Sequence, residues 1–155
     1  MKVLLISINA KYIHTNNAVR LLKANSTFNP KIIEYTIKDK INDIALAINT
    51  EDADVIACSV YIWNVNMFKA LFSKLTLDNK TLILGGPEVS YEASHFIQHT
   101  PADFIIKGEG EHVFESLLQS ISNNTSFEHI SNIAYKKDEK IHQTSIQEIK
   151  DLSTL

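Results

Sequence analysis

The sequence predicts one α/β domain built around a doubly wound parallel sheet. Three observations lead to this prediction. The chain has 155 residues, the length of one domain. Hydrophobic residues make up 45% and charged residues 21%, which is ordinary for a globular protein with a buried core. Short apolar runs alternate with amphipathic segments, and such alternation implies parallel strands, because each right-handed crossover lays a helix on the sheet.

Each predicted strand is a continuous apolar run, as expected for strands buried on both faces of a sheet. The five predicted strands are residues 2–8, 31–37, 54–59, 81–84 and 103–106. Between them, apolar residues recur at spacings of three and four, which predicts helices. The predicted helices are residues 17–23, 41–48, 67–75, 90–99, which Ser90 should cap, and 111–121. Five such units favour the flavodoxin-like strand order 2-1-3-4-5.

The pattern changes after residue 122. Residues 123–129 are polar, and the segments 132–135 and 140–144 predict a small β-hairpin that turns at 137–139. The tail has no pattern of core residues and is predicted to be a linker. The expected organisation is therefore a Rossmann-like domain over 1–122, a hairpin extension over 123–144 and a linker over 145–155.

Charge and composition exclude several classes of partner. The net charge of −3 does not suit a protein that binds the nucleic-acid backbone, which usually carries a basic face. The longest apolar runs are too short to span a bilayer, and no signal peptide is evident, so we expect no membrane partner and a cytoplasmic location. The single cysteine, Cys58, cannot form an internal disulfide or hold an iron–sulfur cluster, and is predicted to be a small buried hydrophobe.

Ligands of doubly wound sheets bind at the carboxyl ends of the strands, near the point where the strand order reverses. All four glycines of the chain fall in two loops at this predicted edge: Gly85, Gly86, Gly108 and Gly110. Glycine allows a positive φ and a close approach of the backbone to a ligand. Tight turns alone would also explain each glycine, but two such loops at one edge favour a binding role.

The loop over residues 59–64 brings Tyr61 and the only tryptophan, Trp63, to the same edge. They could support a flat hydrophobic ligand, although packing of Trp63 on the following helix is an equal alternative. The two glycine loops also carry acids that would suit acid–base catalysis or a hard metal ion: Glu88, Glu109 and Glu111. For Glu111, a favourable interaction with a helix N-terminus is the simpler explanation.

Several well-known sites are absent from the sequence. It contains no G-x-x-x-x-G-K-[ST] phosphate loop, no G-x-G-x-x-G after the first strand and no G-x-S-x-G nucleophile elbow. A receiver domain would need paired acids at the end of the first strand, where the chain has Ser7, Ile8 and Asn9. Phosphate-loop NTP hydrolysis, α/β-hydrolase chemistry and phosphoryl relay are therefore not expected.

The segments 83–90 (ILGGPEVS) and 103–111 (DFIIKGEGE) together resemble the N-terminal cobalamin-binding domain of B12-dependent radical S-adenosylmethionine enzymes. This group includes the anaerobic magnesium-protoporphyrin ester cyclase and many methyltransferases. The resemblance covers about residues 1–122. It implies cobalamin as the cofactor and methyl transfer or related radical chemistry in the full-length protein. It also implies a C-terminal radical domain that would hold a 4Fe-4S cluster and S-adenosylmethionine.

The resemblance also implies which residues contact cobalamin. Ser59 and Tyr61 would lie along its nucleotide tail, Gly86 would let the tail pass close to the backbone, and a side chain such as valine at Gly86 would obstruct the tail without unfolding the domain. The complete implied set is Asn9, Lys11, Tyr12, Ser59, Tyr61, Trp63, Gly85, Gly86, Pro87, Glu88, Gly108, Glu109 and Gly110. No catalytic residue and no metal ligand is expected in this chain.

Two departures from the family pattern matter. Many cobalamin-binding domains carry D-x-H-x-x-G after the first strand, whereas Lys11 stands at the histidine position here, so cobalt ligation by the protein is not expected, with His14 as the one rival. The chain also lacks the C-x-x-x-C-x-x-C motif of a radical domain and is expected to be a non-catalytic fragment. The alternatives are a flavin- or small-molecule-sensing domain of the same fold, or an interaction domain without a cofactor.

Overall fold

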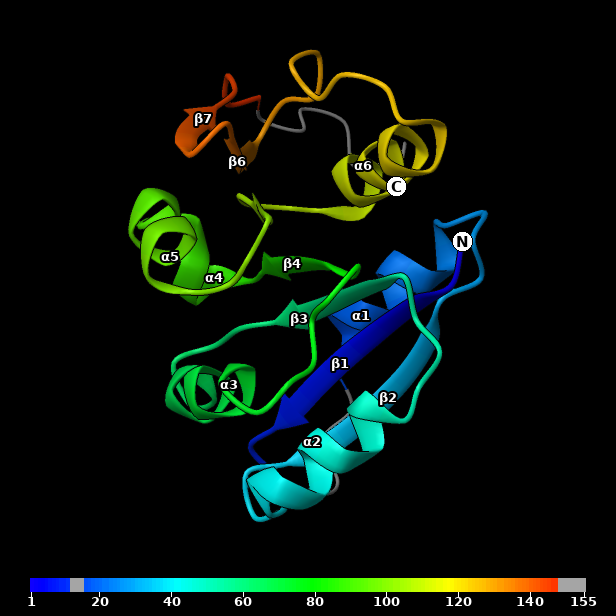
Figure 1. Ribbon diagram of the computed structural model, residues 1–155, viewed down its shortest axis with the longest axis vertical. Helices are drawn as coiled ribbons and strands as arrows, with labels where there is room; N and C mark the ends of the chain where they lie inside the picture. Colours follow the sequence, from blue (N-terminus) through cyan, green and yellow to red (C-terminus); the bar gives the residue numbers. More distant parts are fainter. Residues whose placement is uncertain (12–15, 148–155) are drawn as a thin grey trace.

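The computed structural model describes residues 1–11 and 16–147 and shows one mixed sheet with the strand order β2-β1-β3-β4-β5-β6-β7 (Figure 1). Its first five strands are parallel, which confirms the predicted order 2-1-3-4-5. They are β1 (Val3–Asn9), β2 (Lys31–Thr36), β3 (Val55–Ser59), β4 (Thr81–Gly85) and β5 (Phe104–Ile106).

Helices cover both faces of the sheet (Figure 1). One face packs against α1 (Asn17–Ala24) and α6 (Glu111–Asn123). The other packs against α2 (Ile41–Asn49), α3 (Val65–Phe72), α4 (Pro87–Ser90) and α5 (Ala93–His99). Side chains alternate between the two layers, so that Leu5 lies in the α1/α6 core and Leu4 and Ile6 lie in the other. This two-sided burial explains why the strands read as unbroken apolar runs.

The helix predicted over 90–99 begins only at Ala93, as α5, and Ser90 does not cap it, because Ser90 is the last residue of a separate short helix, α4. α4 begins at Pro87, three residues before the predicted start. A proline is well placed there, because an amide in the first turn of a helix has no hydrogen-bond partner within the helix. The Ser90 hydroxyl donates to the Gly86 carbonyl oxygen at 2.8 Å and accepts from the Gly108 amide at 3.1 Å. Ser90 therefore joins the two glycine loops.

The predicted hairpin is present as β6 (Ile133–Lys137) and β7 (Lys140–Gln143), with a two-residue turn at Asp138 and Glu139. Both turn residues have positive φ, which matches the right-handed twist of the strands. The hairpin does not stand apart from the sheet, since β6 pairs antiparallel with β5. This pairing covers the β5 edge, which would otherwise expose unpaired backbone groups.

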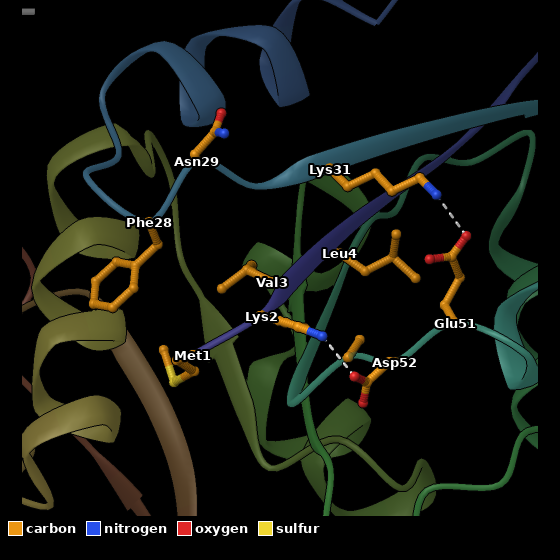
Figure 2. A pocket seen from close by; sticks show the side chains of 10 residues that line it. Met1, Lys2, Val3, Leu4, Phe28, Asn29, Lys31, Glu51 and Asp52 are labelled. Carbon is orange, nitrogen blue, oxygen red and sulfur yellow. Dashed lines mark hydrogen bonds and ion pairs between the residues drawn. The ribbon is translucent and has the colours of Figure 1, made fainter.

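A small hollow of about 300 Å³ lies at the amino ends of the strands (Figure 2). Lys2 Nζ lies 2.6 Å from Asp52 Oδ2, and Lys31 Nζ lies 2.7 Å from Glu51 Oε1. These charges already have partners, and ligands of doubly wound sheets bind at the opposite edge. Among the helices of the described ranges, none is both long and apolar enough to cross a membrane.

Candidate functional site

A cavity of about 940 Å³ opens at the carboxyl edge of the sheet and extends between α1 and α6. Its floor consists of Leu5, Ala57 and Ile83, which lie side by side on β1, β3 and β4. Its walls are mostly apolar and come from the two helices: Ala18, Val19, Leu22 and Phe114. The small side chain of Ala57 at the centre of the floor leaves room above the sheet, so the cavity suits a largely apolar ligand group.

The two glycine loops form the rim of this cavity. The sequence-predicted residues that line it are Ser59, Tyr61, Gly85, Gly86, Pro87, Gly108, Glu109 and Gly110. Gly108 has a φ of 73°, and a Cβ atom there would meet no other atom within 4 Å, so the backbone at this point is open to a ligand. Lining residues that the sequence did not single out include Tyr91, Asn132, Ile146 and Gln147.

Trp63 stands beside the cavity rather than in its wall. Its indole ring stacks on Tyr61, with ring centroids 4.4 Å apart and planes 7° apart. The indole nitrogen donates to the Ile8 carbonyl oxygen at 3.3 Å, and 47% of the residue remains exposed. The pair therefore forms a fixed, partly exposed aromatic surface where the strand order reverses between β1 and β3.

The other predicted residues do not line the cavity. The Asn9 side chain is hydrogen-bonded within the protein, because the Ser7 hydroxyl donates to Asn9 Oδ1 at 2.7 Å. Glu88 lies on α4 outside the lining, Lys11 is exposed, and Tyr12 lies outside the described residues, as does His14. The structure thus gathers the residues of the two glycine loops with Ser59 and Tyr61, and leaves the end of β1 apart.

Buried polar side chains that sequence reasoning missed hold this edge in place. The Asn64 amide donates to the carbonyl oxygens of Ile8 at 3.0 Å and Ser59 at 3.2 Å and accepts from the Tyr61 amide at 2.7 Å. It therefore ties the ends of β1 and β3 to the aromatic loop. Asn16 caps α1 by accepting from the Ala18 amide at 2.9 Å, a role that its position before the helix could have indicated.

The fold itself requires a glycine at position 86, so the prediction that a side chain there would obstruct only the ligand and leave the fold intact is wrong. Its φ is 107°, and a Cβ atom at this position would lie 2.4 Å from the Val60 carbonyl oxygen. The turn after β4 packs directly against the turn after β3, where the Val60 amide donates to the Gly85 carbonyl oxygen at 2.8 Å. A side chain at Gly86 would therefore collide with the protein itself, not only with a ligand.

A known family matches most of this chain. The model of the B12 binding domain matches residues 3–118. The chain belongs to the B12-binding domain family. The match covers every parallel strand, all of α1 and the first eight residues of α6. The cavity is therefore the place in this B12-binding domain where a cofactor fit must be examined.

Relatives of this B12-binding domain are larger proteins. An anaerobic magnesium-protoporphyrin IX monomethyl ester cyclase of Synechocystis sp. is 31% identical over 75 residues, covering 48% of this chain and 15% of that protein. An uncharacterized methyltransferase of Pyrococcus horikoshii is 26% identical over 117 residues, covering 72% of this chain and 25% of that protein. The chain thus spans a quarter or less of these two relatives.

Solved structures share the fold at low sequence identity. The radical S-adenosylmethionine methyltransferase TsrM from Kitasatospora setae, with cobalamin and a [4Fe-4S] cluster bound, matches with a TM-score of 0.74 and 14% identity, over 97% of this chain and 30% of that one. The cobalamin-dependent S-adenosylmethionine radical enzyme OxsB matches with a TM-score of 0.73 and 15% identity, over 96% of this chain and 22% of that one. The flavodoxin-like B12-binding fold is thereby established.

Glu111 provides a test of whether cobalamin fits the cavity. It is the first residue of α6, as its predicted interaction with the helix N-terminus requires, and it also lines the cavity. Its Oε2 atom is buried, with no hydrogen-bond partner among the described residues. A buried acceptor without a partner is costly, so a ligand that offers a hydroxyl or amide N–H satisfies it. Cobalamin carries both kinds of donor, and the residues present fit it.

Cys58 should not react in the folded domain, as the sequence predicts. It is 4% exposed, and burial raises the pKa of its thiol well above the usual range. Because only the thiolate attacks disulfide reagents, we expect no release of thionitrobenzoate from Ellman's reagent under native conditions. One equivalent should be released in urea. Rapid reaction of the native chain would contradict this prediction.

Proposed function

We propose that this chain binds cobalamin at the carboxyl edge of its sheet, with the nucleotide tail in the cavity between α1 and α6. The observation that carries the proposal is the cavity itself, an apolar space of about 940 Å³ whose rim is formed by the two glycine loops. Membership of the B12-binding domain family supports the choice of ligand. The flat Tyr61–Trp63 stack beside the rim suits the edge of a macrocycle.

Individual residues take different roles in this proposal. Gly108 lets the backbone approach the ligand, Ser59 offers a hydroxyl at the rim, and Glu111 accepts a hydrogen bond from a hydroxyl or amide group of the cofactor. When bound, cobalamin supplies a cobalt centre that accepts and donates a methyl group. The protein's part is to bind and orient it and to exclude water from the buried tail.

We infer further that the domain works within a longer enzyme. This chain covers 25% of the methyltransferase relative, and 30% and 22% of the two radical enzymes with the same fold. A radical domain C-terminal to this one would hold the 4Fe-4S cluster and S-adenosylmethionine, since Cys58 alone cannot ligate a cluster. Methyl transfer or related radical chemistry is the proposed activity of that enzyme, and a cytoplasmic location is the proposed setting.

Three ligands titrated in parallel test this function. Cobalamin should bind one to one with a clear change in its absorbance spectrum. Cobinamide, which lacks the nucleotide tail, should bind at least about 10-fold more weakly, since the cavity then stays unused. Flavin mononucleotide should not bind. Equal affinity for cobinamide would reject the placement of the tail, and tight binding of the flavin, or of neither cofactor by a folded chain, would reject the function.

A further inference from the structure

The chain returns to the cavity after the hairpin. Residues 144–147, called the exit segment below, follow β7 and lie beside Asn132 at the start of β6. The Asn132 amide donates to the Ser145 carbonyl oxygen at 2.9 Å. Its side chain donates to the Gln147 carbonyl oxygen at 2.9 Å and accepts from the Gln147 amide at 2.7 Å. A side-chain amide thus replaces a backbone peptide and continues the pairing as far as Gln147, four residues beyond the end of β7.

Asn132 is itself held firmly. It is 7% exposed, and its carbonyl oxygen accepts from the Lys107 amide at 2.7 Å, at the end of β5. Its φ is 63°, a left-handed conformation that asparagine adopts more readily than most residues. Backbone position and side-chain direction are therefore both fixed, and the side chain acts as a rigid bracket between the sheet and the exit segment.

The exit segment forms part of the cavity. Ile146 and Gln147 line it together with Asn132. Ile146 is 74% exposed and Tyr91, on the same rim, is 94% exposed. A ligand that fills the cavity would cover these two large side chains, which now face solvent at its mouth. Removing them from water favours the bound state.

We propose that Asn132 is a positioning residue of the cofactor site: its side-chain amide holds the exit segment as the outer wall of the cavity, where Ile146 packs on the bound cofactor. This inference rests on the proposed function for the identity of the ligand. Binding and the path of the exit segment are then coupled, and the coupling acts in both directions. The cofactor orders the exit segment, and the fixed exit segment retains the cofactor.

Asn132→Asp is the sharpest test, because aspartate keeps the size and the tolerance of positive φ but cannot donate to the Gln147 carbonyl oxygen. Cobalamin should dissociate roughly 10-fold faster from this variant, as for the loss of one hydrogen bond of about 1.4 kcal/mol. Hydrogen exchange of the Gln147 amide should also rise in the ligand-free chain. The carboxylate keeps the acceptor for that amide, but it faces the Gln147 carbonyl oxygen at hydrogen-bond distance and repels it, which displaces the exit segment. In the wild type, cobalamin should slow that exchange.

Asn124→Asp is the matched control, since Asn124 also has a positive φ, at the end of α6, and does not line the cavity. It should change neither the dissociation rate nor the exchange of Gln147. Ile146→Ala should also speed dissociation, whereas Ile141→Ala on β7 should not.

The outcomes separate the two halves of the proposal. If hydrogen exchange of the Gln147 amide were unchanged in Asn132→Asp, the Asn132 side chain would not hold the exit segment. If that exchange rose but the dissociation rate of cobalamin did not change, the exit segment would not act as a wall of the cofactor site. If the wild type bound no cobalamin, the proposed function would fail instead. Hydrogen exchange of the Gln147 amide in the ligand-free chain would still show whether Asn132 holds the exit segment.

Discussion

Replacing Ala57 with leucine should weaken cobalamin binding by at least about 100-fold, which corresponds to roughly 2.8 kcal/mol, while the domain stays folded. Ala57 lies at the centre of the cavity floor between Leu5 and Ile83. The larger side chain would enter the space proposed for the nucleotide tail. Most small-to-large changes in a core cost stability through crowding, but here the added atoms meet a cavity. Titration with cobalamin and thermal unfolding measure the two effects.

Ala47→Leu is the control, because Ala47 is a half-exposed alanine of α2, in the helical layer on the other face of the sheet. It should bind cobalamin as the wild type does. If Ala57→Leu failed to fold, the smaller change Ala57→Val should still lower affinity. Wild-type affinity in a folded Ala57→Leu variant would show that the ligand does not use this cavity.

The second large effect concerns stability. Gly86→Val should destabilise the domain by about 3 kcal/mol or more, because it combines a positive φ with a Cβ atom placed 2.4 Å from the Val60 carbonyl oxygen. The backbone at Val60 cannot move away without breaking its hydrogen bond to Gly85. Urea unfolding followed by circular dichroism measures the loss.

Gly108→Ala measures the cost of backbone strain without a steric clash, since Gly108 has a positive φ of 73° but no atom within 4 Å of the added Cβ. It should cost only about 1–2 kcal/mol. A Gly86→Val variant as stable as the wild type, with reduced affinity for cobalamin alone, would mean that this glycine serves the ligand rather than the fold.

Local sequence patterns predicted the elements of this fold well, because apolar strand runs and helical periodicity both depend only on residues close together in the chain. They predicted β1 and α2 within one or two residues. They did not predict that β6 would pair with β5, since that contact joins residues about 30 positions apart in the chain. Nor did they predict the break between α4 and α5, where the Ser90 hydroxyl accepts a hydrogen bond from the Gly108 amide, far along the chain.

The rim of the candidate site was easier to predict than its interior. Glycines at strand ends are visible in a sequence, whereas Leu5 and Ala57 look like any other core residues. What makes them a cavity floor is the space that α1 and α6 leave between them, and no single segment encodes that distance. Ser7 and Asn64 were missed for a similar reason, because their partners come from other strands and loops.

The hairpin also sets the direction in which the chain travels. β6 runs antiparallel to β5, and β7 runs antiparallel to β6, so β7 has the same direction as β5. The backbone therefore leaves β7 at the same edge of the sheet at which β5 ended. Any module joined by a short tether after this point starts within reach of the carboxyl edge of the sheet, where the proposed cofactor site lies. Tethering of this kind gives an effective concentration in the millimolar range, without any interface of its own between the two modules. A single antiparallel strand in place of the hairpin would have delivered that module to the opposite end of the sheet.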